Sequence, residues 1–252
     1  MITVTRVNTI SVKQKNTPIN EFVNIMSWHP KDTKYYELSP YYLKTDGNEE
    51  NESPPGVIFE NYYQGSKIYE YVYDIEVYPH HSFKGNPKYL RWKYICSNNL
   101  GNEIHYDSLT DTIQAEYYIW KNSLNNCLHA IRYPNKKTNA KKCQFSMGTI
   151  NGVQHRYNYL NARKEIYVKE YCRLIRQLPI YYHLLQLLRK GVNITIAEMD
   201  VPYKGKKGYY GTLLDINGNY IPDLNNINLL LNDASEAFGH GLCLCKALLE
   251  DL

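Results

Sequence analysis

The sequence lacks any long apolar run. No window approaches the roughly 18 uninterrupted apolar residues of a membrane-spanning helix. The first residues, MITVTRVNTISVKQKN, show neither a positive segment followed by an apolar run nor a small-residue cleavage site. We therefore expect a soluble, cytoplasmic protein that is not secreted and has no membrane partner. The glycosylation sequons at Asn51 and Asn193 carry no weight without a secretory route.

Familiar catalytic and metal-binding motifs are missing as well. The chain has no G-x-S-x-G elbow, no H-E-x-x-H, no zinc-type pairing of Cys and His, and no dinucleotide fingerprint. Its six cysteines include no C-x-x-C pair, so reduced thiols are favoured over a disulfide framework. We expect neither a metal nor a cofactor.

The chain also has little net charge. A formal charge of +4, with 43% hydrophobic and 21% charged residues, is typical of an ordinary globular protein. The basic residues are scattered, apart from short clusters at 135–142 and 204–207. A dedicated duplex-DNA binder is usually more basic and more clustered. Binding of phosphorylated small molecules, or weak contact with nucleic acid, remains open.

Hydrophobic patterning predicts a mixture of helices and strands. Alternation favours strands at 1–13, 69–77 and 192–197, while helical spacing occurs at 59–67, 113–130, 160–178 and 179–190 and in the last residues. No repeat or linker is evident. We predict one α+β domain over residues 1–252, with helices around a small mixed sheet and with the strands of 1–13 and a surface loop at 27–57 in peripheral positions.

One polar stripe stands out among aromatic residues, in FENYYQGSK at 59–67. On a helix advancing about 100° per residue, Glu60, Gln64 and Lys67 fall within roughly 60° of one another. An acid, an amide and an ammonium on one helix face are typical of a solvated surface. They are also the groups from which a polar site is built.

Further polar residues stand where elements begin or end. Asp200 follows the strand at 192–197, a place where loops gather ligands, although it is equally suited to capping a turn. Gly239, His240 and Gly241 begin the last helix, where main-chain N–H groups can approach an anion. The same three residues also suit a tight turn, with His240 as its cap.

Three segments resemble a known family. ELSPYYLKTDG, FENYYQGSKIY and the closing FGHGLCLCKALLEDL are similar, in this order, to the signature of the NADAR (YbiA-like) superfamily, and the middle of the chain resembles a large-DNA-virus or protist branch of it. The sequence departs from the family at Asn61, where a His is usual, and at Cys243 and Cys245, which replace Asn and Gly.

The resemblance implies an α+β fold and an N-glycosidase that cleaves the bond between ribose and a base-like group. Its substrate would be a phosphorylated nucleoside or an ADP-ribosyl group, including ADP-ribosylated guanine, with modified nucleic acid as a further partner. Glu60 would be the catalytic carboxylate and Asp200 the second one. The implied substrate-binding residues are Ser39, Gln64, Lys67, Trp92, Arg132, Arg163, Gly239, His240 and Gly241.

Two other classes of function stay open from the residues alone. Abundant tyrosines and the change at Asn61 favour a module that binds nucleotide, ADP-ribose or modified nucleic acid without turnover. The third possibility is a structural or host-interaction protein with a degenerate pocket.

Overall fold

The computed structural model describes residues 1–7, 17–26, 34–48, 53–73, 102–125, 130, 143–203 and 212–252. Their contacts divide the chain into two compact units. The first unit comprises Met1–Leu43 and Arg163–Leu252, and the second comprises Lys44–Ala162. The prediction of a single domain over 1–252 is not tested by this division and stays a prediction.

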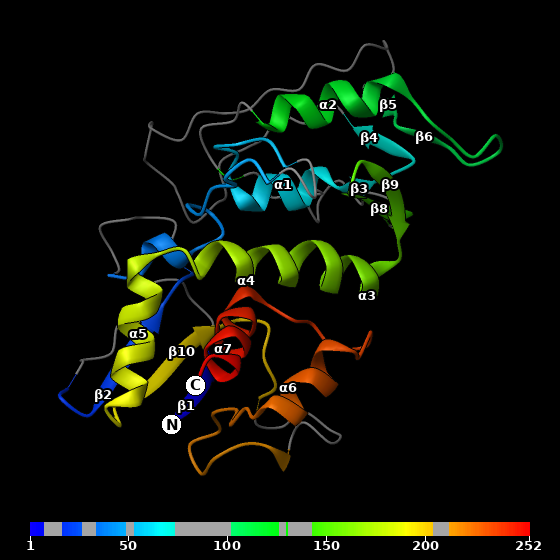
Figure 1. Cartoon of the computed structure of the whole chain (residues 1–252). Helices are drawn as coiled ribbons and strands as arrows, with labels where there is room; N and C mark the ends of the chain where they lie inside the picture. Colours follow the sequence, from blue (N-terminus) through cyan, green and yellow to red (C-terminus); the bar gives the residue numbers. More distant parts are fainter. Residues whose placement is uncertain are drawn as a thin grey trace, which may run out of the picture. The chain divides into compact units, whose positions relative to one another are not determined.

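Among its described residues, the first unit contains a parallel sheet (Figure 1). In spatial order its strands are β1 (Ile2–Arg6), β10 (Asn193–Glu198) and β2 (Asn20–Asn24). Val4 of β1 pairs with Ile196 of β10, and both side chains are fully buried. The strand at 2–6 therefore belongs to the core of this unit, and the prediction of a peripheral strand is wrong there, while 8–13 lie outside the described residues.

Helices pack against this sheet: α5 and α7 contact β10, and α4 and α6 contact α7. The helical elements are η2 (Tyr36–Leu38), η5 (Arg163–Val168), α4 (Lys169–Ile175), α5 (Pro179–Arg189), α6 (Leu224–Leu231) and α7 (His240–Glu250). Leu184 of α5 and Leu242 of α7 are fully buried, as expected where an apolar helix face covers a sheet.

Local signals explain where two of these helices begin and end. Pro179 is the first residue of α5, and Gly191 follows the helix with a φ of +83° that glycine adopts without strain, as predicted. Helix α6, which our sequence analysis missed, begins with a capping box. The Asp223 carboxylate accepts from the Asn226 amide at 2.8 Å, and the Asn226 side chain accepts from the Asp223 amide at 2.9 Å.

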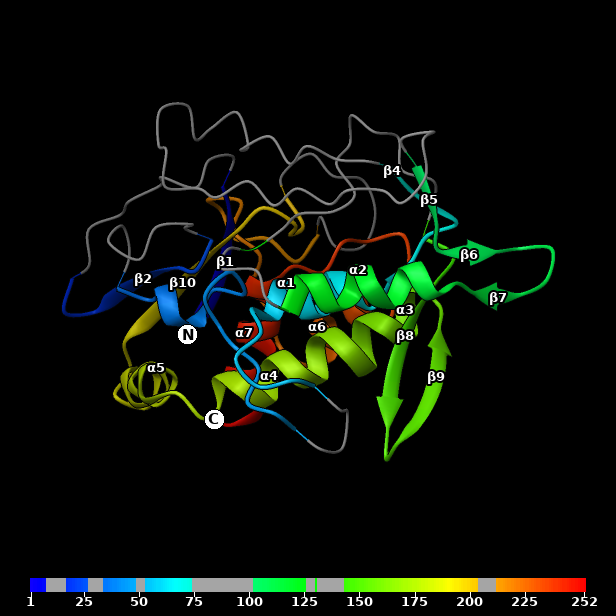
Figure 2. The same cartoon turned by 90° about the horizontal axis from the view of Figure 1, so that it is seen from above.

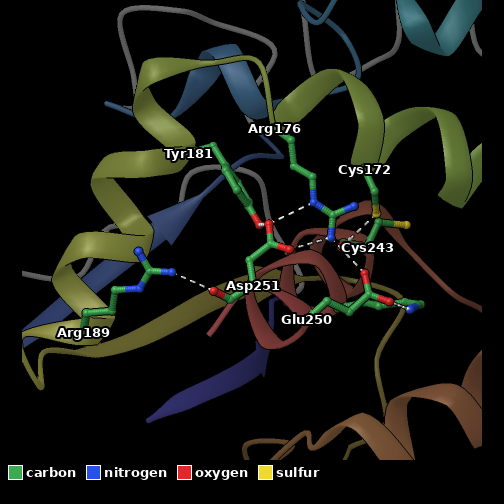
Figure 3. A network of polar contacts seen from close by, with 8 residues as sticks. Cys172, Arg176, Tyr181, Arg189, Cys243, Glu250 and Asp251 are labelled. Atoms are coloured by element: carbon green, nitrogen blue, oxygen red, sulfur yellow. Dashed lines mark hydrogen bonds and ion pairs between the residues drawn. The ribbon is translucent and has the colours of Figure 1, made fainter.

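A polar network holds the C-terminal end of α7 to α4 and α5 (Figure 3). The Asp251 carboxylate accepts from Arg176 Nε at 2.9 Å and from the Tyr181 hydroxyl at 2.6 Å. Arg189 donates to the Asp251 carbonyl at 2.8 Å. The guanidinium of Arg176 holds the pKa of Asp251 below its usual value against the opposing effect of burial, so the carboxylate stays charged within this network.

The second unit combines antiparallel strands with short helices (Figure 2). Its strands are β3 (Lys67–Ile68), β4 (Tyr71–Tyr73), β5 (Asn102–Ile104), β6 (Tyr106–Asp107), β7 (Thr112–Ile113), β8 (Phe145–Ile150) and β9 (Val153–Tyr157). They pair as β3-β8-β9, β4-β5 and β6-β7. Asn151 and Gly152, both with positive φ, turn the chain between β8 and β9.

The helices of this unit are α1 (Phe59–Gly65), α2 (Ala115–Asn125) and α3 (Tyr159–Ala162). α1 packs on α2, and a Cβ at Gly65 would lie 3.3 Å from Leu124 Cδ1, so glycine permits this close approach. Ile68, Tyr69, Tyr117, Trp120 and Leu124 form a buried apolar cluster beside it.

The prediction of a peripheral surface loop at 27–57 is wrong for the residues of this segment that the structure describes. Tyr35, Leu38 and Val57 are at most 2% exposed. The Leu38 carbonyl accepts from the buried Tyr171 hydroxyl at 2.6 Å, which ties this segment to α4. Turn residues and charges in the sequence suggested solvent exposure, but the tyrosines and leucines between them are drawn into the core by their apolar area.

The described residues thus form an α+β structure, as predicted, with small parallel and antiparallel sheets. No helix within these ranges is long and apolar enough to cross a membrane.

A buried histidine is expected to make stability depend on pH. His105 is fully buried, with its ring centroid 5.4 Å from that of Trp120, and desolvation lowers its pKa to about 3. The unfolded chain takes up a proton below a pKa of about 6.5, whereas the folded protein does not. Stability is therefore fully present above pH 6.5 and falls with decreasing pH, by about 2 kcal/mol at pH 5.

Urea unfolding of His105→Phe at pH 7.5 and pH 5 measures this contribution. Between pH 7.5 and pH 5, the free energy of unfolding of the variant should fall by about 2 kcal/mol less than that of the wild type. His155→Phe, which changes an exposed ring on β9, is the matched control. An unchanged pH dependence in His105→Phe would contradict the assignment.

Candidate functional site

The predicted site residues are distributed over both units. Glu60, Gln64 and Lys67 belong to the second unit. The first unit contains Ser39, Arg163, Asp200, Gly239, His240 and Gly241. Trp92 and Arg132 lie outside the described residues, so their predicted roles stay predictions.

Glu60 and Gln64 form a buried pair on α1. Each side chain is 8% exposed, and Gln64 Nε2 donates to Glu60 Oε1 at 2.7 Å. The spacing of four residues places the amide one helical turn beyond the carboxylate, as the sequence predicted. Their burial excludes the interpretation of this stripe as a solvated helix face.

Lys67 extends the pair from a different element. Helix α1 ends at Gly65, so Lys67 lies on β3, where its main chain pairs with Ser146 of β8. Its Nζ donates to Gln64 Oε1 at 2.9 Å and lies 4.4 Å from the centroid of the Tyr63 ring. The prediction that all three residues share one helix is wrong at Lys67, although the side chains do meet.

Cys143 lies close enough to Lys67 for the ammonium to affect its thiol. Burial raises the pKa of Cys143, and the positive charge of Lys67 partly opposes this rise. The thiol donates to the Phe145 carbonyl at 3.2 Å. Because the net shift is upward, Cys143 is a poor nucleophile at neutral pH.

A second buried carboxylate, that of Glu198, lies against the first residues of α7. It is 2% exposed at the end of β10. Its Oε2 accepts from the Gly241 amide at 2.6 Å, and its Oε1 accepts from the amides of Met199 and Asp200 at 2.7 and 3.0 Å. The anion that the Gly241 amide meets is therefore a side chain of the protein itself, whereas the resemblance implied that Gly241 binds the substrate.

The two glycines at 239 and 241 make room for this carboxylate. A Cβ on Gly239 would lie 2.5 Å from both oxygens of Glu198, and one on Gly241 would lie 2.8 Å from Oε2. Real Cβ atoms do not approach oxygen so closely. The requirement for glycine at these positions is thus explained by the fold.

Asp200 does not have the environment predicted for a second catalytic carboxylate. Asp200 is exposed, and its main-chain amide donates to Glu198 Oε1. Glu198 continues the every-second-residue series of the buried Ile194 and Ile196. That alternation was the signal in the sequence that pointed to Glu198 as the inward-facing acid.

Arg163 serves the fold of the first unit. It is 3% exposed and begins the π-helical segment η5. Its guanidinium donates to main-chain carbonyls within 230–236, namely those of Leu230, Leu231, Asp233 and Glu236. The prediction of a substrate ligand is corrected by this burial, because the donors already bind the C-terminal end of α6 and the segment before Gly239.

Ser39 and His240 also lie within the packing of the first unit. Ser39 is fully buried, and its hydroxyl accepts from the Tyr41 amide at 3.4 Å within a turn. The His240 ring stands nearly perpendicular to that of Tyr41, with centroids 6.1 Å apart, and its Nε2 is buried without a hydrogen-bond partner in the described part of the chain. Within the described residues, neither side chain hydrogen-bonds to Glu198, whose donors are the amides of Met199, Asp200 and Gly241.

Thiol and metal chemistry find little support in the described ranges. Burial raises the pKa of Cys172 to about 12 and raises those of Cys243 and Cys245 on α7, which makes these thiols unreactive. Within the same ranges, no group of three or more His, Cys, Asp or Glu side chains is placed to hold a metal ion.

No family model, no curated protein and no solved structure matches this chain. The functional assignment therefore depends on the residues and their geometry.

Proposed function

We propose that the protein is an N-glycosidase acting on a phosphorylated nucleoside or an ADP-ribosyl substrate, with Glu60 as its catalytic carboxylate. One observation supports this more than any other. Glu60 is 8% exposed, yet Gln64 is its single hydrogen-bond donor among the described residues. A carboxylate offers about four acceptor positions, and burying it with few donors is unfavourable. Such groups are concentrated at functional sites.

Glu198 shows what a structural carboxylate looks like in the same chain. It is buried as deeply as Glu60, but three main-chain amides donate to it. Both of its oxygens are engaged, so it has a complete explanation in the fold. Glu60 has one oxygen held by Gln64, and the other has no donor among the residues that the structure describes, which leaves that oxygen for a substrate.

The chemistry suits a carboxylate of this kind. As the bond between ribose and the base breaks, positive charge develops on the ribose carbon, and a nearby carboxylate stabilises it or accepts a proton from the attacking water. The bonding electrons leave with the nitrogen, hydroxide from water joins the ribose carbon, and the remaining water proton ends on the released base. A weakly solvated carboxylate interacts more strongly with the developing charge than one in bulk water.

The proposal extends to the finer fold and to the other substrate contacts. The resemblance of 59–69 and 238–252 to the NADAR superfamily supports a fold of that type. Arg132 and Trp92 are proposed to contact the phosphate and the base, respectively. The commitment of Arg163 and Gly241 to internal contacts removes two of the substrate-binding residues that the resemblance implied.

A mass-spectrometric screen tests the proposal. Purified protein is incubated with nucleotides, ribosylaminopyrimidine phosphates and nucleic acid carrying ADP-ribosylated guanine. We expect the wild type to release a free base or sugar and Glu60→Gln to release none. Glu116→Gln, the same change in the first turn of α2, is the matched control and should retain activity.

Two results would replace this function. A ligand bound but left unchanged by both the wild type and Glu60→Gln would indicate a binding module. Full activity in a correctly folded Glu60→Gln would exclude Glu60 as the catalytic group.

A further inference from the structure

The Gln64 amide has two chemically different ends, and its neighbours fix which end faces Glu60. Lys67 Nζ donates to Gln64 Oε1 at 2.9 Å, and Gln64 Nε2 donates to Glu60 Oε1 at 2.7 Å. An ammonium donates and never accepts, whereas a carboxylate accepts and never donates. A flipped amide would place its NH₂ against the ammonium and its oxygen against the carboxylate, so both hydrogen bonds would be lost together.

The ammonium is held from β3 as well as from α1. The main chain of Lys67 pairs with Ser146 in the β3-β8 ladder, and the Met147 amide donates to the Ser66 carbonyl at 2.7 Å beside it. The Tyr63 ring, 4.4 Å from Nζ, adds a cation–π contact. The position of the charge is therefore set by the strand pairing and the ring as well as by Gln64.

We infer that Lys67 and Gln64 are positioning residues for Glu60, an inference that rests on the proposed function. Lys67 orients the Gln64 amide, the amide holds Oε1 of the carboxylate, and Oε2 is directed to the ribose carbon. Lys67 thus acts through Gln64 and is not a ligand of the substrate phosphate, whereas the family resemblance implied that it binds the substrate directly.

The two roles predict different kinetics. Loss of a phosphate ligand weakens binding of the substrate and raises KM, whereas loss of a positioning residue lowers kcat with little change in KM. Arg keeps the positive charge and the N–H donors, so Lys67→Arg should retain much of the orientation, while Lys67→Met keeps the length of the side chain without its charge.

The experiment measures kcat and KM for Lys67→Met, Lys67→Arg and the control Lys44→Met, which removes an exposed lysine of the same unit. We expect Lys67→Met to lower kcat by about tenfold or more with KM within about twofold of the wild type. Lys67→Arg should recover most of this loss, and Lys44→Met should match the wild type. A raised KM with unchanged kcat in Lys67→Met would overturn the inference.

A second measurement does not depend on activity. Hydrogen exchange of the Gln64 side-chain NH₂, followed by ¹⁵N NMR, should be at least about tenfold faster in Lys67→Met than in the wild type and unchanged in Lys44→Met. Equal exchange in Lys67→Met and the wild type would refute the orienting role. If the wild type turns over no substrate, the N-glycosidase proposal fails by itself, and the exchange rates still decide whether Lys67 orients the amide.

Discussion

Replacing Gly239 by Ala is expected to destabilise the protein by about 3 to 5 kcal/mol. The backbone is not the cause, because a φ of −81° and a ψ of 172° suit alanine as well as glycine. The cause is the new methyl group, which would lie 2.5 Å from both oxygens of the Glu198 carboxylate. Either α7 moves away from β10 or the carboxylate leaves its amide donors.

Urea unfolding measures the effect, and Gly191→Ala is the matched control. No atom of the described residues lies within 4 Å of a Cβ at Gly191, so only its φ of +83° opposes the change, at about 1 kcal/mol. A double variant, Gly239→Ala with Glu198→Ala, removes the clash and should show a coupling of at least about 2 kcal/mol. Additive effects of the two substitutions would show that the methyl group does not meet this carboxylate.

Elements with a strong local signal could be predicted from the sequence. The helix α5 lies between Pro179 and Gly191, and both residues act at its ends as expected. The strand β10 follows from the alternation of Ile194 and Ile196. The hairpin β8-β9 was missed although Asn151 and Gly152 form a typical two-residue turn.

The candidate site was predictable only in part, for a physical reason. Glu60 and Gln64 are only four residues apart, so helical spacing in the sequence predicted that their side chains meet. Their burial depends on packing from distant segments, which a local pattern does not contain. The same holds for Arg163, whose carbonyl acceptors lie about 70 positions further along the chain.

Replacing Arg163 by Met is expected to destabilise the protein by about 3 kcal/mol. The variant keeps a long apolar stem and removes the buried charge together with its donors. The main-chain carbonyls of Asp233 and Glu236 then lose the guanidinium as their hydrogen-bond donor. The Leu231 carbonyl at the end of α6 loses it as well. Buried acceptors left unpaired cost more than a hydrogen bond contributes, so the loss is not offset by removing the charge.

The neighbouring Lys164 provides the matched control for this change. Its Nζ reaches Asn232 Oδ1 at 3.1 Å on the exposed side, so Lys164→Met should change stability by no more than about 0.5 kcal/mol. Arg163→Lys should fall between the two, since one ammonium cannot reach carbonyls spread over residues 230–236. Hydrogen exchange should rise first in 232–239 in Arg163→Met, because that segment leads into α7 and depends on the guanidinium. A loss of less than about 1 kcal/mol in Arg163→Met would mean that water replaces the guanidinium and that Arg163 is free for another role.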